Sequence, residues 1–422
     1  MKVSDSYRKP ILRSSFTELT YLVQILVIGA GPSGLLLCLL LARAGIQVTL
    51  LDSESTIDAR PRAAHYAPSA IRVLARAGVL DDVRRAGLIP KHMTWRNIDG
   101  TPVTSIYDVA QPENPDALTV LPLNLLGEIL LVHAERDELI DVRWQSRVAS
   151  VAQDGTQAWA VLKADDGTET RVAADYICGC DGANSQVRRT LFGDKNFPGK
   201  TWDAQIVATN VYYPFENFGY DDINFIMHPR DYYMAAKITT DGLWRVSYGE
   251  DSQLTAEEVR ANQPIKFERM LPGHPKPTDY KLLSVGPYRI HQRCADRFRV
   301  GRICLAADAA HLCNPFGGMG LTGGIVDVGG LAECFEGIVS GRADDSILDK
   351  YDEVRRRIYH DLIDTISSSN FLRVSATDPD TAVEKDEFLA LVNKAKDDPQ
   401  TKRRLNESVY DICYDFTQHY NN

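Results

Sequence analysis

The first patterned part of the chain is an apolar segment, a glycine turn, a second apolar segment, a short polar break and a third apolar segment. The first segment ends at Val27 and Ile28, the second is Leu35–Ala42 and the third is Ile46–Leu51. This order predicts a buried strand, a buried helix and a second buried strand. Leu35–Ala42 is too short to cross a bilayer, which takes about 20 apolar residues. We therefore predict a βαβ unit and no transmembrane segment.

The rest of the chain alternates between helical and strand-like patterns. Apolar spacing predicts helices over Ser69–Ala77 and Leu123–Arg136, and a helical region that begins with Ile347–Ile366. Period-two alternation predicts strands over Arg147–Val151, Ala158–Ala164, Arg171–Cys180, Ile206–Tyr213, Asn224–His228, Tyr232–Ile238 and Leu243–Tyr248. The first three strands form a meander with Asp-Gly turns, and the last four predict an antiparallel sheet. The run Arg355–Arg357 is expected on a solvated or ion-paired helix face.

These patterns predict an α/β fold with two intimately joined domains and C-terminal helices. A discontinuous Rossmann-type nucleotide-binding domain takes residues 22–95, 123–199 and 286–345. An antiparallel-sheet substrate domain takes residues 96–122 and 200–285, and the helical region takes residues 346–422. Residues 1–21 have no predicted function.

The glycine turn carries the first chemical signal. It reads Gly29-Ala30-Gly31-Pro32-Ser33-Gly34, and Asp52 follows 23 residues after its first glycine. In such a motif the first glycine permits the tight turn, the second lets the backbone approach a pyrophosphate, and the third lets helix and strand pack closely. The phosphates meet free amides at the positive end of the helix dipole, and the acid accepts ribose hydroxyls. The motif predicts a dinucleotide without distinguishing FAD from NAD.

Composition and charge narrow the class of protein. The 422 residues are 44% hydrophobic and 25% charged, which is typical of a globular protein of this size. A net charge of −10 and the absence of a basic run argue against nucleic-acid binding. The eight cysteines form no C-x-x-C pair, so we expect no metal site. The N-terminal sequence lacks the apolar core of a signal peptide. We expect a soluble cytoplasmic protein, monomeric or homodimeric, with free thiols.

Two later segments indicate which dinucleotide the motif binds. One is Tyr176–Arg189, which contains Asp181-Gly182, and the other runs from Gly301 through Asp308 to Asp327. With the glycine turn, they resemble the three signatures of the p-hydroxybenzoate hydroxylase-like FAD-dependent monooxygenases, also called class A flavoprotein hydroxylases. The resemblance covers roughly residues 22 to 345. Within the family, the chain is most similar to fungal members that modify aromatic or polyketide-type secondary metabolites. It implies that NADPH reduces FAD, that O₂ forms a flavin C4a-hydroperoxide, and that an electron-rich aromatic substrate, phenolic or polyketide-type, takes one oxygen atom.

The resemblance also implies a set of cofactor-binding residues. Arg62 lies along the pyrophosphate and can meet NADPH, Asp181 serves both nucleotides, and Asp308 holds the ribityl chain. The backbone N–H groups of Leu321 and Thr322 face the flavin N1/O2 edge and stabilise its reduced anion. The full predicted set is Gly29, Gly31, Ser33, Gly34, Asp52, Arg62, Asp181, Asp308, Gly318, Gly320, Leu321 and Thr322.

Three positions depart from the family pattern. Ala307 stands where glycine is usual, Thr322 where asparagine is usual, and Leu123 where a glutamine often contacts FAD. We expect the methyl group of Ala307 to be tolerated if its φ is negative.

The substrate is expected between the flavin and the aromatic-rich sheet. Strand alternation does not say which side chains face it, so the predicted substrate residues are Tyr212, Phe225, Met227, Tyr233, Trp244 and Phe316. A phenol needs a base or a cation to form its phenolate, and the candidates are Arg245, Tyr232 and His228, with Pro315 beside the flavin. His291 and His311 lie near the motifs and are expected to be structural.

Other activities stay open on the sequence alone. The same flavin chemistry serves an epoxidase of an alkene or indole-type substrate, which needs no phenolate-forming group. A flavin reductase or dehydrogenase would consume NADPH without oxygen insertion. A nucleotide-binding protein that has lost turnover is disfavoured by Asp308 and by the glycine-rich run after Pro315.

Overall fold

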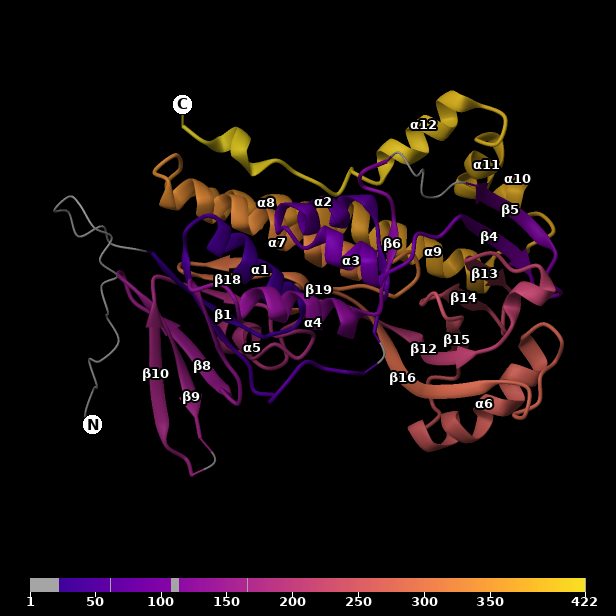
Figure 1. Ribbon diagram of the computed structural model, residues 1–422, viewed down its shortest axis with the longest axis horizontal. Helices are drawn as coiled ribbons and strands as arrows, with labels where there is room; N and C mark the ends of the chain where they lie inside the picture. Colours follow the sequence, from indigo (N-terminus) through magenta and orange to yellow (C-terminus); the bar gives the residue numbers. More distant parts are fainter. Residues whose placement is uncertain (1–22, 61, 108–113, 165, 422) are drawn as a thin grey trace.

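A computed structural model of the protein describes residues 23–60, 62–107, 114–164 and 166–421 (Figure 1). Its first sheet has six strands in the order β17-β18-β11-β1-β2-β7, parallel except for the β17–β18 pair. The strands are β1 (Gln24–Ile28), β2 (Gln47–Leu51), β7 (Ile140–Arg143), β11 (Tyr176–Gly179), β17 (Arg299–Val300) and β18 (Ile303–Leu305). The predicted βαβ unit is confirmed as β1, α1 (Pro32–Arg43) and β2.

Helix α1 is apolar all round because it is covered on every side. It packs against the sheet, against α4 (Leu123–Ala134) and against α7 (Met319–Val339). Its residues from Gly34 to Ala42 are all buried. A helix without a polar face belongs in the interior of a protein, and this one fixes the glycine turn at the carboxyl end of β1.

The predicted meander is present, with one correction. It consists of β8 (Val148–Gln153), β9 (Ala158–Lys163) and β10 (Glu169–Ala174). The single strand expected over Arg171–Cys180 is instead two strands, β10 and β11, in different sheets. They separate at Asp175, whose carboxylate accepts the Gln24 N–H at 2.8 Å. The pattern also changes there, since β11 is fully buried whereas β10 is mostly exposed.

The second sheet has eight strands in the order β19-β16-β12-β15-β14-β13-β4-β5. They are β4 (His92–Asn97), β5 (Pro102–Tyr107), β12 (Gly199–Tyr212), β13 (Ile223–Met227), β14 (Tyr233–Lys237), β15 (Leu243–Glu250), β16 (Lys281–Cys294) and β19 (His311–Leu312). All neighbours are antiparallel except β13 and β4. Helix α6 (Ala256–Met270) covers one face and buries Val259 and Phe267 against it. The other face turns toward the first sheet.

The remaining helices surround these sheets. They are α2 (Pro68–Arg76), α3 (Leu80–Ala86), α5 (Gln186–Phe192), α8 (Ile347–Ile358), α9 (Thr365–Ala376), α10 (Ala382–Lys385), α11 (Glu387–Lys394) and α12 (Pro399–Ser408). The helix predicted over Ile347–Ile366 continues through one π-helical turn, Tyr359–Asp364, into α9. Figure 1 shows α10 and α11 beside β4 and β5. Within the described residues, no helix combines the length and apolarity that crossing a membrane requires.

Candidate active site between the two sheets

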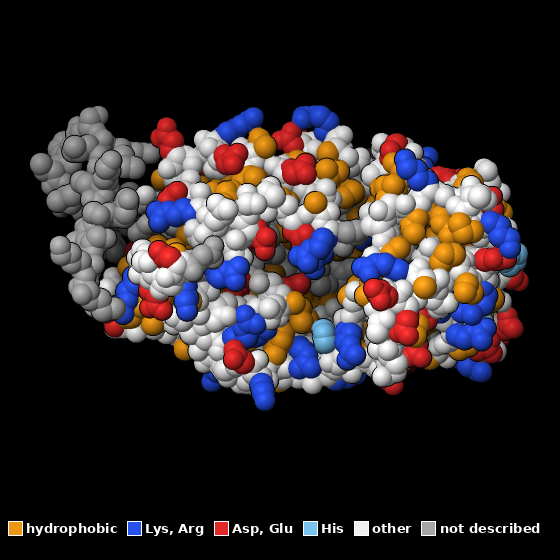
Figure 2. Space-filling model, turned by 90° about the horizontal axis from the view of Figure 1, so that it is seen from below, with side chains coloured by type: hydrophobic (Ala, Val, Ile, Leu, Met, Phe, Trp, Pro, Cys, Tyr) orange, Lys and Arg blue, Asp and Glu red, His pale blue; other side chains and the backbone are white. Residues whose placement is uncertain are grey.

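A cleft of about 2340 Å³ lies between the two sheets. Its lining on one side follows the carboxyl ends of the parallel strands, at Gly31, Asp52, Asp181 and Asp308. Ligands of open α/β sheets bind at such an edge. Its other side is one face of the eight-stranded sheet. Figure 2 shows the molecule hollowed near the middle of one face, with Lys and Arg side chains around the hollow. The volume exceeds what a single small ligand fills and suits a dinucleotide next to a substrate.

The glycine turn is shaped as its spacing predicts. Gly29 has φ +105°, and a Cβ there would lie 2.4 Å from the Cys180 carbonyl oxygen. A Cβ on Gly34 would lie 1.9 Å from the Gly29 carbonyl oxygen. On Gly31, by contrast, a Cβ would meet no atom of the described residues within 4 Å. Two glycines therefore serve protein packing, and the third leaves room beside the backbone.

The polar groups at this turn are oriented and free to bind a nucleotide. The Asp52 carboxylate accepts N–H groups of Ala30 at 2.6 Å and Glu54 at 2.8 Å, which fixes it at the cleft. Helix α1 starts with Pro32 and has no side-chain cap, so its first turn presents unpaired amides to the cleft beside Ser33. Arg62 also lines the cleft, half-exposed and paired with Asp58.

Asp181 serves the protein and the cleft at once. One carboxylate oxygen accepts the N–H groups of Gln186 at 2.6 Å and Val187 at 3.1 Å, at the start of α5. The other oxygen is buried without a hydrogen-bond partner among the described residues. Burial raises the pKa of this carboxyl above its ordinary value. An unsatisfied oxygen in a cleft-lining residue fits a ligand donor such as a ribose hydroxyl.

The backbone beside Asp308 does not meet the condition set for Ala307. Its φ is +55°, not negative, so its methyl group stands in the left-handed region. Its N–H donates to the Asp327 carboxylate at 3.1 Å. Asp308 itself lines the cleft with its side chain exposed there, and partial loss of water around it raises the pKa of its carboxyl. No hydrogen bond to Asp308 is found within the described part of the chain, which leaves both oxygens for a ligand.

Asp327 ties this segment to the C-terminal helices. Its carboxylate lies 2.6 Å from Arg355 Nε and 2.7 Å from His311 Nε2, and all three side chains are buried. Burial acts to raise the Asp327 pKa, but the Arg355 and His311 charges hold it at about 2. Arg355 is thus ion-paired in the core, whereas Arg357 of the same run is exposed, so both alternatives predicted for the run occur. His311 has a packing role here, and His291 binds Thr201 outside the cleft.

The glycine-rich run forms the start of α7. Gly318, with φ +66°, is its N-cap, and Pro315, Gly318, Gly320 and Leu321 line the cleft. The Leu321 N–H lies in the first turn and has no partner among the described residues, as the prediction requires. The Thr322 N–H instead donates to the Gly318 carbonyl at 3.2 Å. This corrects the role expected for the Thr322 amide.

Strand parity decides which aromatic and basic side chains reach the cleft. On β15, Arg245 and Ser247 line it, whereas Trp244 points to the opposite face. The same cleft face carries Phe225 of β13 and Trp95 of β4, whose rings stack at 5.6 Å.

Five of the six predicted substrate residues do not line the cleft. Trp244 and Tyr233 pack in the core under α6, where the Tyr233 hydroxyl lies 2.8 Å from that of Tyr220. Tyr212 bonds to Asp241 at the surface. Met227 and Phe316 are buried in the apolar cluster that also contains Phe225, but they do not line the cleft. Phe225 alone remains at the cleft.

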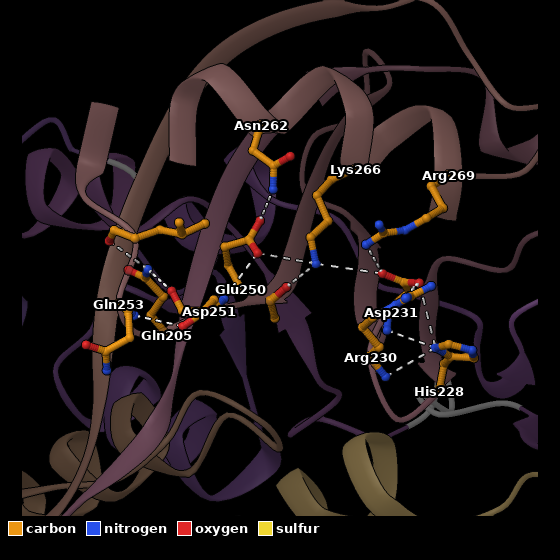
Figure 3. Close-up of polar contacts among 12 residues, drawn as sticks. Gln205, His228, Arg230, Asp231, Glu250, Asp251, Gln253, Asn262, Lys266 and Arg269 are labelled. Atoms are coloured by element: carbon orange, nitrogen blue, oxygen red, sulfur yellow. Dashed lines mark hydrogen bonds and ion pairs between the residues drawn. The ribbon is translucent and has the colours of Figure 1, made fainter. Parts of the chain in front are cut away.

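Two of the predicted catalytic residues are also displaced from the cleft. His228 Nδ1 accepts the N–H groups of Arg230 and Asp231, beside a buried ion network under α6 (Figure 3). In that network Lys266 Nζ lies 3.7 Å from Asp231 and 3.5 Å from Glu250. Tyr232 packs edge-on against Phe316 and Phe371. These positions correct the prediction for His228 and Tyr232.

Arg245 is a buried cation at the substrate side of the cleft. Its side chain is buried, and its Nε donates to Asn210 Oδ1 at 2.7 Å and its Nη1 to the Arg62 carbonyl at 2.5 Å. No carboxylate pairs with it within the described residues. Burial lowers its pKa to about 10, so it stays charged at neutral pH.

Two cleft residues near Arg245 were missed by the sequence. His65 Nε2 is buried without a partner, and burial together with the Arg245 charge lowers the His65 pKa to about 4. Tyr288 of β16 lines the cleft as well, and the walls of the cleft shield its hydroxyl from water, which raises its pKa. In the sequence, His65 could have been noticed only because it lies close to Arg62. Tyr288 lies in the long strand β16, which carries no motif, so nothing in the sequence marked it.

Comparison with known proteins identifies the family. Residues 22–366 match the FAD binding domain family. A para-nitrophenol 4-monooxygenase of a Pseudomonas species is 36% identical, over 86% of this chain and 90% of its own length. A 6-hydroxy-3-succinoylpyridine 3-monooxygenase of Pseudomonas putida is 35% identical, over 82% of this chain and 88% of its own.

The fold agrees with this relationship. The crystal structure of a p-nitrophenol 4-monooxygenase from Pseudomonas putida matches with a TM-score of 0.86 and 33% identity, over 93% of this chain and 98% of that one. The resemblance stated from the sequence is thereby confirmed. The chain belongs to the FAD binding domain family and is an FAD-dependent monooxygenase of aromatic compounds.

Proposed function

We propose that the protein uses NADPH and O₂ to hydroxylate a single-ring aromatic compound that carries a ring hydroxyl group. The observation that carries the proposal is Arg245, a buried cation that faces the cleft without a carboxylate partner in the described part of the chain. Removing a charge from water costs several kcal/mol unless it is paired. A phenolate bound in the cleft would supply the missing negative charge.

Arg245 also accounts for activation of the ring. An opposite charge nearby favours the ionised form of a titrating group and lowers its pKa, here that of the substrate hydroxyl. The phenolate is the more electron-rich ring and the better nucleophile toward an oxygen donor. FAD, when bound, supplies the reducing and oxygen-transferring chemistry. The chain supplies position, charge and a cleft lined by Trp95 and Phe225.

His65 is better suited to orient the hydroxyl than to remove its proton. A histidine with a pKa of about 4 is neutral at pH 7 and is a weak base. Its buried Nε2 lacks a partner, so a substrate oxygen would satisfy it. Arg245 therefore provides the larger effect in our proposal, and His65 fixes the direction of the hydroxyl group.

The residues at the nucleotide side fit FAD. Open space beside Gly31, free amides at the start of α1, and the open carboxylate of Asp308 lie along one cleft. We propose that Asp52 binds the ribose, Asp308 the ribityl chain and the Leu321 N–H the flavin edge. NADPH as the reductant is supported by the family resemblance.

The relatives support a small substrate. Their names specify a nitrophenol and a hydroxypyridine, each a single ring with a hydroxyl group. A role in secondary metabolism stays a prediction. We also propose a cytoplasmic enzyme, because all eight cysteines are unpaired, which suits a reducing compartment. A monomer or homodimer stays a prediction.

The test is reduction and oxygen labelling of the purified holoprotein. We expect a single-ring phenol such as 4-nitrophenol to accelerate anaerobic reduction of bound FAD by NADPH at least tenfold. Under oxygen-18 gas, each product molecule should gain one labelled oxygen atom. NADPH consumption without label in any product would overturn the proposal in favour of a reductase. Labelling of an alkene or indole but of no phenol would favour the epoxidase.

A further inference from the structure

The C-terminal helices form part of the substrate wall, and α11 lies beyond residue 366, where the match to the family model ends. After α9 the chain passes β5, and α11 packs against that strand. Phe388, Leu391 and Val392 of α11 line the same cleft as Arg245. Figure 1 shows α11 beside β4 and β5, at the end of the sheet far from β16. The pocket is therefore completed by a segment outside both sheets.

Phe388 is the aromatic residue that α11 contributes. Its ring meets the edge of Trp95 with centroids 5.6 Å apart and an interplanar angle of 71°. Trp95 in turn stacks on Phe225. All three rings line the cleft, two from the sheet and one from the helix. They form an aromatic corner, Trp95, Phe225 and Phe388, into which a flat ring can pack.

The position of Phe388 is held by a buried charge pair. Arg373 of α9 lies 2.9 Å from Asp386, and its side chain is 6% exposed. Asp386 also caps α11 by accepting the Leu389 N–H at 2.9 Å. The Arg373 guanidinium lies 4.6 Å from the centre of the Phe388 ring. A ring fixed between Trp95 and Arg373 has few alternative positions, so it sets a firm limit to the space beside it.

We propose that Phe388 is a specificity-determining residue that restricts the pocket to single-ring substrates. The proposal rests on the proposed function, because it assumes that the substrate ring lies on the aromatic corner. Replacing Phe388 with a smaller residue opens the wall toward α11, where a second fused ring would fit. Replacing it with a larger residue narrows the space for the first ring.

The experiment compares phenol with 2-naphthol in the holoenzyme and in three variants, Phe388→Ala, Phe388→Leu and Phe388→Trp. For each protein, kcat/KM and the dissociation constant from flavin absorbance changes are measured with both compounds. We expect Phe388→Ala to raise the naphthol-to-phenol ratio at least tenfold, Phe388→Leu to raise it less, and Phe388→Trp to lower it. The matched control is Phe218→Ala, an exposed aromatic outside the cleft, with an unchanged ratio.

Separate measurements report on the folding of each variant and on its substrate preference. FAD content and thermal unfolding identify any variant that does not fold, and Phe388→Leu and Phe388→Trp then decide the question. Ratios that stay within twofold of the wild type in folded variants would overturn the role of Phe388. If the wild type hydroxylates neither these compounds nor 4-nitrophenol, the proposed function fails, whereas the ratio of the two dissociation constants still tests the role of Phe388.

Discussion

The two sides of the cleft present different kinds of groups to a ligand. On the nucleotide side, the groups are backbone amides and short acids placed by turns, as at Gly31, Asp52 and Asp308. On the substrate side, they are long side chains on alternate positions of strands, as at Arg245 and Phe225. A turn requires certain residues at certain spacings, so it leaves a motif in the sequence. A strand face requires only that every second residue point the same way.

The geometry of the nucleotide side is therefore set by residues close together in the sequence, whereas the geometry of the substrate side depends on the whole fold. The Gly29 turn has its shape because of contacts with its own helix and with Cys180. The direction of Arg245 depends on how β15 pairs with β12 and β14, which come from distant parts of the chain. Substitutions on the two sides should therefore separate stability, cofactor binding and catalysis.

The largest effect is expected for Gly34→Ala. The new Cβ would lie 1.9 Å from the Gly29 carbonyl oxygen, a backbone atom that cannot move aside without shifting the turn. We expect the free energy of unfolding of the apoprotein to fall by at least about 3 kcal/mol, and FAD to be lost. Urea unfolding and the FAD content of the purified protein measure this. A loss below about 1 kcal/mol would show that helix and turn tolerate separation.

The next effect concerns the substrate side. Arg245→Met removes the only charge that we assign to the phenolate, so kcat/KM for the phenol substrate should fall about 100-fold or more. The dissociation constant of FAD should change less than threefold. Steady-state kinetics and FAD titration measure the two quantities.

The matched control for Arg245 is Tyr232→Phe. Tyr232 is a catalytic candidate from the sequence that the structure places against Phe316 and Phe371, outside the cleft. We expect kcat/KM to stay within about twofold of the wild type. If both variants lose activity equally while remaining folded, strand parity does not separate active from inactive residues.

The sequence predicted the nucleotide side well and the substrate side poorly. It located the turn, the acids and the strands of the βαβ unit, because each depends on neighbours within a few residues. It missed His65 and Phe388, which reach the cleft only because distant segments fold over it. It placed Trp244 beside Arg245 as a candidate, although adjacent strand residues point to opposite faces. Parity could be predicted only if one cleft-facing residue were known beforehand.

A smaller effect separates stability from cofactor binding. Gly31 has φ −67° and ψ 171°, which alanine adopts without strain, and a Cβ there meets no atom within 4 Å in the part of the chain that the structure describes. We expect Gly31→Ala to leave the apoprotein within about 0.5 kcal/mol of the wild type. FAD binding should weaken at least tenfold, because the methyl group enters the space of the phosphates. Titration of apoprotein with FAD measures this, and wild-type affinity would place the phosphates elsewhere.

The smallest effect should be a gain in stability. Ala307 is held at φ +55°, in a region that costs a residue with a Cβ about 1–2 kcal/mol. Ala307→Gly removes this cost but adds about 0.5–1 kcal/mol of unfolded-state entropy, so a net gain of about 1 kcal/mol or less is expected. Ala306→Gly is the matched control, since Ala306 is buried at φ −141° and gains nothing from glycine. It should lose about 1 kcal/mol.

Urea unfolding of both apoproteins measures the pair. The difference between them isolates backbone strain, because both substitutions remove one buried methyl group from adjacent residues. If Ala307→Gly and Ala306→Gly destabilise equally, the left-handed backbone at Ala307 carries no strain. A stabilised Ala307→Gly variant that also binds FAD as tightly as the wild type would show that the methyl group is not needed to hold Asp308 toward the cleft. The strained backbone at Ala307 would then lower the stability of the protein without strengthening its binding of FAD.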